Sequence, residues 1–127
     1  MELVAIVVLL SLIQYTYFGV LVGKARTTYK VEAPAVSGDP VFERYYRVHM
    51  NTLESLVLFL PSIFVFATYI SADIAAALGV IFIAGRQLYL RAYVKDPKSR
   101  GLGYMLTFLP SAIMAIGGIV GAIMNIS

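Results

Sequence analysis

Polar side chains recur at helical spacing within an apolar part of this 127-residue chain. Arg47, Asn51 and Glu54 are spaced i, i+4 and i+7, so a helix would carry them on one stripe. Apolar residues 56–60 follow Glu54 and place its carboxylate at or below a membrane boundary. An ionisable group at that depth is costly unless it is paired or lines a polar cavity, which makes it a functional candidate. The simpler interpretation is an internal ion pair between Arg47 and Glu54 that holds the helix.

A second polar stripe follows later in the chain. Arg86, Tyr89 and Tyr93 are spaced i, i+3 and i+7, so they would present a cation and two phenols on one helix face. Arg100 comes after the helix break expected at Pro97 and would add a guanidinium above the same opening. Taken singly, Arg86 could extend its charged end to the membrane surface, and the tyrosines could be interfacial anchors. Two stripes directed at one opening favour a binding site.

The ligand of such a site would carry several charges. Guanidinium groups pair with carboxylates through two parallel hydrogen bonds, and a glutamate pairs with an ammonium group. A set of arginines with one carboxylate, one amide and two phenols therefore suits a small molecule with more than one carboxylate and an ammonium. A charged, peptide-like compound has this chemistry.

The elements that must position these residues are membrane helices. Hydrophobic residues make up 60% of the chain and charged residues 13%, which leaves too little polar surface for a soluble globule. About 20 apolar residues are needed to cross a bilayer. Four segments have this length: Leu3–Val22, Leu53–Ile70 within a helix that begins near Phe42, Ile74–Tyr93 and Leu102–Ile126. The sequence therefore predicts an all-α membrane protein, a single domain over residues 1–127 whose four transmembrane helices form an antiparallel bundle.

The connections between these helices differ in character. The segment Lys24–Val41 contains two prolines and a glycine and is expected to lie as irregular backbone over the opening. Asp96 and Pro97 should break or kink the third helix, and Gly101 with Gly103 should loosen the start of the fourth.

All ten basic residues lie in the first and third connections or on the neighbouring helix ends. They are Lys24, Arg26, Lys30, Arg44, Arg47, Arg86, Arg91, Lys95, Lys98 and Arg100. Short cytoplasmic loops collect lysine and arginine, so both connections should face the cytoplasm and both termini the opposite side. The net charge of +3 is too small to suggest nucleic acid and suits anionic lipid or an anionic ligand.

Other interpretations of the apolar segments are weaker. The first segment has no basic residue before it and is too long for the apolar part of a signal peptide. A transmembrane barrel would need period-two alternation, which these segments lack. The chain has no cysteine and one histidine, so neither a disulfide framework nor a metal site is expected. His49 could act as an acid or base, but a positional role is expected more often for a lone histidine.

The stretch from Phe42 to Glu54, FERYYRVHMNTLE, resembles the signature of the MAPEG family, the membrane-associated proteins of eicosanoid and glutathione metabolism. Its His49–Glu54 part is most similar to the microsomal glutathione S-transferase 3 branch. Gly85–Tyr89, together with Tyr93 and Arg100, extends the resemblance into the third helix.

The resemblance implies a homotrimer with one glutathione, the cosubstrate, at each subunit interface on the cytoplasmic side. The glutathione-binding residues it implies come from one subunit and its neighbour: Arg47, Asn51, Glu54, Tyr89 and Tyr93 from one, and Arg26 and His49 from the other. Arg86 joins this set as a further cation. Arg100 matches the arginine beside the sulfur and is the expected catalytic residue. The expected protein is a multi-pass glutathione transferase of a bacterial inner membrane or the endoplasmic reticulum. It would act on lipophilic electrophiles, and reduction of lipid hydroperoxides is a second reaction open to the same thiolate.

The chain departs from the leukotriene-forming branch of the family at two positions, and two other functions remain as alternatives. The leukotriene-forming branch has an arginine and a tyrosine where this chain has Thr27 and Ser55, so a dedicated leukotriene synthase is not expected. A non-catalytic lipid-binding member of the same fold is one alternative. The other is a small multidrug or cation exporter, in which Glu54 would be a proton-coupled binding site; such exporters usually carry their glutamate in the first span, where this chain has Gln14.

Overall fold

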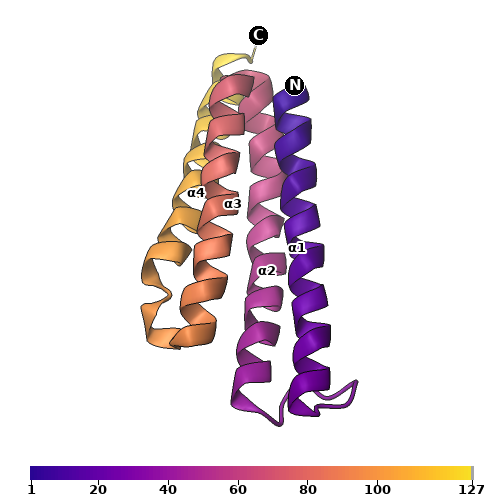
Figure 1. Ribbon diagram of the computed structural model, residues 1–127. Helices are drawn as coiled ribbons and strands as arrows, with labels where there is room; N and C mark the ends of the chain where they lie inside the picture. The colour runs from indigo at the N-terminus through magenta and orange to yellow at the C-terminus, as the bar shows by residue number, and fades with distance from the viewer. Residues whose placement is uncertain (127) are drawn as a thin grey trace.

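The computed structural model describes residues 1–126 and consists of four long helices (Figure 1). The helices are α1 (Glu2–Tyr29), α2 (Pro40–Tyr69), α3 (Ala72–Lys95) and α4 (Gly101–Met124), and a short 3₁₀ turn, η1 (Pro97–Ser99), lies between α3 and α4. All four are long and apolar enough to cross a membrane. The prediction of an all-α protein with four transmembrane helices is confirmed.

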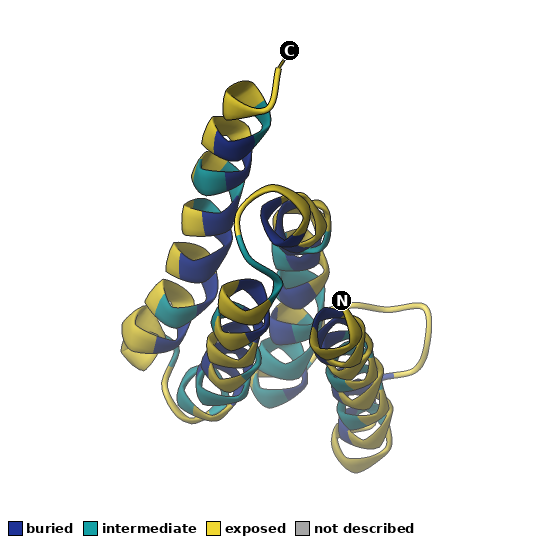
Figure 2. Ribbon diagram, turned by 90° about the horizontal axis from the view of Figure 1, so that it is seen from above, coloured by how far each residue is buried: buried dark blue, intermediate teal, exposed yellow. Residues whose placement is uncertain are grey.

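The helices α2 and α3 lie in the middle of the molecule, with α1 on one side and α4 on the other (Figures 1 and 2). The α1–α2 and α3–α4 connections lie at one end, which we call the basic end because it carries the lysines and arginines of these connections. The two termini and the α2–α3 connection lie at the opposite end (Figure 1). This arrangement brings residues from α2, α3 and α4 together inside the bundle, near its basic end.

Apolar side chains pack between the helices and also cover the outside of the bundle. The core contains the stacked rings of Phe59 and Phe82, with centroids 3.9 Å apart, and the fully buried Ile63. Outward-facing residues are equally apolar: Val57 is 70% exposed and Ile116 65% exposed. Figure 2 shows this exposed outer face around the buried inner one. A surface of this composition is compatible with lipid and not with water.

Local sequence sets the helix ends. The Asp39 carboxylate accepts hydrogen bonds from the backbone N–H groups of Val41 and Phe42, both at 2.9 Å, and Pro40 occupies the first helical turn of α2. Helix α3 ends at Lys95, before Pro97, as the sequence predicts.

The prediction of irregular backbone over Lys24–Val41 is wrong for the first six residues of that segment and for its last two, which begin α2 at Pro40. Helix α1 continues to Tyr29, and the next residue, Lys30, adopts a left-handed conformation with φ 57°. No glycine or proline interrupts residues 24–29, and Ala25 is buried against Phe42. Packing and helix propensity therefore carry the helix beyond its predicted end.

Gly103 does not loosen α4. A Cβ atom at this position would lie 2.6 Å from the backbone nitrogen of Tyr89, so α3 and α4 touch backbone to backbone. Gly85 makes the equivalent approach from α3, where a Cβ would lie 2.8 Å from the carbonyl carbon of Leu106. Small residues at both positions let the two helices approach closely, as is common between membrane helices.

Candidate active site

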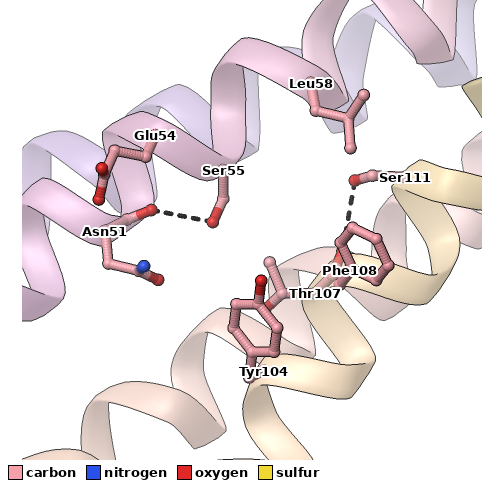
Figure 3. Close-up of a pocket in the computed structure, with 8 residues that line it drawn as sticks. All are labelled: Asn51, Glu54, Ser55, Leu58, Tyr104, Thr107, Phe108 and Ser111. Atoms are coloured by element: carbon pink, nitrogen blue, oxygen red, sulfur yellow. Dashed lines mark hydrogen bonds between the residues drawn. The ribbon is translucent and has the colours of Figure 1, made fainter.

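Two adjoining cavities lie beside α2, one bounded by α2, α3 and α4 and the other by α2 and α4 alone. The cavity nearer the basic end, here called the rim cavity, has a volume of about 410 Å³. It is lined by Arg47, Met50, Asn51, Glu54, Tyr89, Tyr93, Arg100, Gly101 and Tyr104. The second, here called the inner cavity, has a volume of about 310 Å³. It is lined by Asn51, Glu54, Ser55, Leu58, Tyr104, Thr107, Phe108 and Ser111 (Figure 3).

The rim cavity collects the whole first stripe and the two tyrosines of the second, but not Arg86. Arg47, Asn51 and Glu54 line it from α2, while Tyr89 and Tyr93 line it from α3. The spacing of each set places its members on one helix face, and the packing of α2 on α3 then turns the two faces toward one space. Arg100 lines the same cavity from the start of α4.

Glu54 and Arg47 do not form the helix-holding ion pair considered above. Throughout residues 1–126, the single ion pair joins the N-terminal ammonium to Glu2. Both Arg47 and Glu54 are exposed side chains of the rim cavity. Two guanidinium groups and one carboxylate are therefore available to a ligand of mixed charge.

The two tyrosines form a stacked pair. The rings of Tyr89 and Tyr93 have centroids 5.5 Å apart and planes inclined by 14°. Tyr89 is 5% exposed, so its ring is fixed by packing, and the guanidinium carbon of Arg86 lies 4.3 Å from the centre of that ring. The pair gives the rim cavity a rigid wall with two phenolic hydroxyl groups.

Arg86 is in a different position from the other predicted ligand-binding arginines. Its side chain is fully buried and is not among the residues that line either cavity. The guanidinium donates to Asn51 Oδ1 at 2.8 Å, to Thr52 Oγ1 at 3.2 Å and to Thr107 Oγ1 at 2.9 Å. It therefore lies behind Asn51 as seen from the rim cavity.

Arg26 and His49 are also outside the two cavities. The Arg26 guanidinium donates to the Ala35 carbonyl at 2.7 Å and lies 4.8 Å from the centre of the Phe42 ring. The His49 ring stacks on Tyr15 of α1 with centroids 4.4 Å apart. One chain alone does not bring these two residues to Glu54.

The sequence analysis did not predict that residues of α4 after Arg100 line the site. Tyr104 lines both cavities, and Thr107, Phe108 and Ser111 line the inner cavity. Arg100, Tyr104, Phe108 and Ser111 recur at steps of four, four and three residues, which is one face of a helix. That spacing was a usable signal, although most residues between its members are apolar.

The two cavities differ in chemistry. The rim cavity has cations, a carboxylate and an amide, so it suits a charged ligand. The inner cavity lies beside Leu58 and Phe108, which are 38% and 44% exposed on the outer surface of the bundle. Because Asn51, Glu54 and Tyr104 line both cavities, a charged and an apolar molecule could meet there.

Comparison with known proteins agrees with the expected family. The MAPEG family model matches residues 4–120. The chain is 38% identical to human microsomal glutathione S-transferase 2, over 94% of this chain and 81% of the relative. It is 39% identical to an uncharacterized protein of Synechocystis sp., over 91% of this chain and 85% of the relative. It is 30% identical to leukotriene C4 synthase of Rattus norvegicus, over 89% of this chain and 87% of the relative. Special similarity to the microsomal glutathione S-transferase 3 branch stays a prediction. The chain belongs to the MAPEG family.

Proposed function

We propose that this protein is a membrane glutathione transferase, which activates glutathione as a thiolate and conjugates it to lipophilic electrophiles. The observation that carries the proposal is the rim cavity, where two arginines, one glutamate, one asparagine and two stacked tyrosines from three helices converge. Glutathione has two carboxylates and one ammonium group, which are the partners that this set requires. Relatives named glutathione S-transferase support the same cosubstrate.

The binding residues divide between two subunits in this proposal. Arg47, Asn51, Glu54, Tyr89 and Tyr93 would hold glutathione from one subunit. Arg26 and His49 would reach it from a neighbour, since their own chain keeps them away from the rim cavity. The proposed assembly is a homotrimer with the site on the cytoplasmic side.

Arg100 is the proposed catalytic residue. The thiolate is the nucleophilic form of a thiol, and a cysteine thiol has an ordinary pKa of about 8.5. Lowering that pKa by about 2 units requires roughly 2.7 kcal/mol of differential stabilisation, which one close guanidinium in a partly dry site can supply. The carboxylates of glutathione oppose this shift, so Arg47 and its neighbours must first neutralise them.

The second substrate would enter from the membrane through the inner cavity. Its exposed apolar lining, Leu58 and Phe108, suits a lipophilic molecule that partitions into the bilayer. In conjugation, the glutathione sulfur forms a bond to an electrophilic carbon, and that carbon either loses a leaving group or passes the electron pair of its double bond or epoxide to a neighbouring atom that takes a proton. In peroxide reduction, the thiolate attacks the terminal oxygen of a lipid hydroperoxide, the O–O bond breaks, and the lipid alcohol leaves with a proton. A second glutathione then converts the resulting glutathione sulfenic acid to the disulfide and water, and the proposal includes this reaction as a further activity.

The test measures equilibrium glutathione binding, the ultraviolet absorbance of the thiolate and conjugation of hydrophobic electrophiles by the purified protein in detergent. We expect the parent to bind glutathione and to form the thiolate near neutral pH. Arg100→Ala should keep binding but lose most of the thiolate absorbance and lower turnover roughly 25-fold at pH 7, because a rise of the thiol pKa from about 6.5 to about 8.5 lowers the thiolate fraction from about 0.76 to about 0.03. The pH at which turnover is half-maximal should rise toward the ordinary thiol pKa.

Arg91→Ala is the matched control. Arg91 is exposed on α3 and lines neither cavity, so the same charge is removed without effect on the thiol. A protein that ignores glutathione would instead fit a cation exporter or a non-catalytic lipid-binding member of the family. Equal losses of glutathione binding and turnover in Arg100→Ala would reassign Arg100 to anchoring.

A further inference from the structure

Arg86 joins the three helices that form the rim cavity. It extends from α3, donates to Asn51 and Thr52 of α2 and to Thr107 of α4, and lies against the Tyr89 ring. The side chain is fully buried although it carries a charge. It is the largest fully buried side chain of residues 1–126.

The hydrogen bonds of Arg86 do not neutralise its charge. No carboxylate of the described chain lies within ion-pair distance of it, and its Nη2 atom is buried without a hydrogen-bond partner in residues 1–126. A buried, uncompensated cation is costly in a membrane protein. A neutral amide could tie three helices at a smaller cost, so helix packing alone is a poor reason for an arginine here.

Asn51 connects this buried charge to the rim cavity. Its side chain lines both cavities and is drawn in Figure 3 where it enters the space between α2 and α4. A guanidinium only donates hydrogen bonds, so the atom of the Asn51 amide that faces Arg86 must be the oxygen. The amide nitrogen, with its two N–H donors, is then the atom left for a ligand.

We propose that Arg86 is a positioning residue that fixes the orientation of the Asn51 amide, so that the Asn51 NH₂ group donates to an acceptor of glutathione. Arg86 acts through Asn51 and does not touch the ligand. This inference rests on the proposed use of glutathione and deepens it, since it assigns the donor role at one point of the site. An asparagine free to rotate would present its oxygen to the same acceptor about as readily and would repel it.

The experiment is a double-mutant cycle between Arg86→Met, which keeps the length of the side chain but removes every donor to Asn51, and Asn51→Ala, read as the glutathione KM and kcat in detergent. Each single variant should raise the KM roughly tenfold, the usual effect of a lost hydrogen bond to a charged group. The kcat should stay close to the parental value because Arg100, at the sulfur, is unchanged. The double variant should be no worse than Asn51→Ala alone. Multiplicative losses would show that Arg86 binds the ligand independently and would overturn the proposal.

A second variant keeps the proposal testable if Arg86→Met does not fold. Asn51→Asp keeps an oxygen for Arg86, and gains an ion pair with it, but loses the NH₂ donor. Its melting temperature should equal or exceed that of the parent, while its glutathione KM should rise as in Asn51→Ala. A parental KM in Asn51→Asp would contradict donation by Asn51.

Gln14→Leu is the matched control for loss of a half-buried hydrogen bond between helices. Gln14 of α1 donates to the Ile83 carbonyl of α3 at 2.9 Å and lines neither cavity. This variant should leave the glutathione KM unchanged, whatever it does to the melting temperature. A tenfold rise would mean that the KM reports a general loosening of helix packing and would overturn the assignment.

The failure of this inference can be told apart from the failure of the proposed function. If the parent does not bind glutathione, the proposed function fails. If it binds glutathione but the losses in the cycle are multiplicative, only the role of Arg86 fails.

Discussion

At the scale of single residues, the site depends on charges that are held apart from one another until a ligand arrives. Arg47, Glu54 and Arg100 line one cavity without an ion pair among them in the described part of the chain. Charges that already neutralised one another would have to separate before binding a ligand, at a cost to affinity. Their separation therefore favours a ligand that brings both signs of charge.

Glu54→Gln tests whether the carboxylate of the rim cavity pairs with a positive group of the ligand. The glutamine keeps the size of the side chain but loses the charge that would pair with the glutathione ammonium, so we expect affinity for glutathione to fall roughly ten- to hundredfold. Stability should change little because Glu54 is exposed and makes no ion pair in residues 1–126. Isothermal titration and thermal unfolding measure the two quantities. Glu2→Gln, the same change at the opposite end, is the control, and equal affinity in Glu54→Gln and the parent would remove Glu54 from the site.

At the scale of elements, the position of α4 against α3 fixes the site. Gly85 and Gly103 let the two backbones touch beside Tyr89 and Thr107. Tyr89 lies in the wall of the rim cavity and Thr107 accepts from Arg86, so helix separation and site geometry are linked. Adding one methyl group at this contact should therefore change the shape of the rim cavity and weaken glutathione binding.

Gly103→Ala should separate α3 from α4 locally. The new Cβ would lie 2.6 Å from the Tyr89 backbone nitrogen, which no rotamer change can relieve. We expect a loss of about 1–3 kcal/mol in stability and a raised glutathione KM, measured by thermal unfolding and steady-state kinetics.

Gly23→Ala is the matched control, because nothing lies within 4 Å of a Cβ at that position of α1 and Gly23 lines neither cavity. It should be neutral or stabilise α1 by up to about 1 kcal/mol, the difference in helix propensity between alanine and glycine. Similar behaviour of the two alanine variants would argue against the close contact at Gly103.

At the scale of the whole molecule, one end of the bundle is basic and carries the opening of the site. The termini and the α2–α3 connection lie at the other end (Figure 1). Arg26 and His49 lie on the α1 side of the molecule, away from the rim cavity. Each chain thus carries one half of the proposed site at its rim cavity and the other half, for a neighbouring subunit, on the face near α1.

Labelling with a membrane-impermeant thiol reagent tests the proposed orientation, and the chain has no cysteine of its own to interfere. Ser37→Cys lies in the α1–α2 connection and Asn125→Cys follows α4, and both positions are exposed. We expect Ser37→Cys to react from the cytoplasmic side and Asn125→Cys from the opposite side, since basic loops stay in the cytoplasm. Reaction of both from one side would contradict four membrane crossings in this arrangement.

Subunit mixing tests the shared site. Activity is measured with glutathione far below the parental KM, where a loss of affinity appears as a loss of rate. A chain with both Arg26→Ala and His49→Ala and a chain with Glu54→Gln should then each keep at most about a tenth of parental activity alone. Co-expressed in equal amounts, they should recover about a quarter of parental activity, because each site takes one half from each of two neighbouring chains. Co-expression of Glu54→Gln with Asn51→Ala, which damage the same half, is the control and should not exceed the activities of these two variants alone. Equal recovery in both mixtures, or none in either, would refute a site shared between subunits.

The sequence by itself determined the helices, the basic end and the two polar stripes. These follow from hydropathy and spacing within single segments, and a 3.6-residue turn puts Arg47, Asn51 and Glu54 on one face wherever the helix packs. The residues of α4 that complete the inner cavity were at the same spacing but lacked a charged member below Arg100.

Only the tertiary structure decided what each polar residue faces. Arg86 and Arg100 are both arginines near the same opening, yet one is fully buried behind Asn51 and the other lines the cavity. The difference arises from contacts between α2, α3 and α4, in particular the close approach at Gly103. Such contacts join residues far apart in the chain, so no local pattern specifies them; the packing of whole helices does.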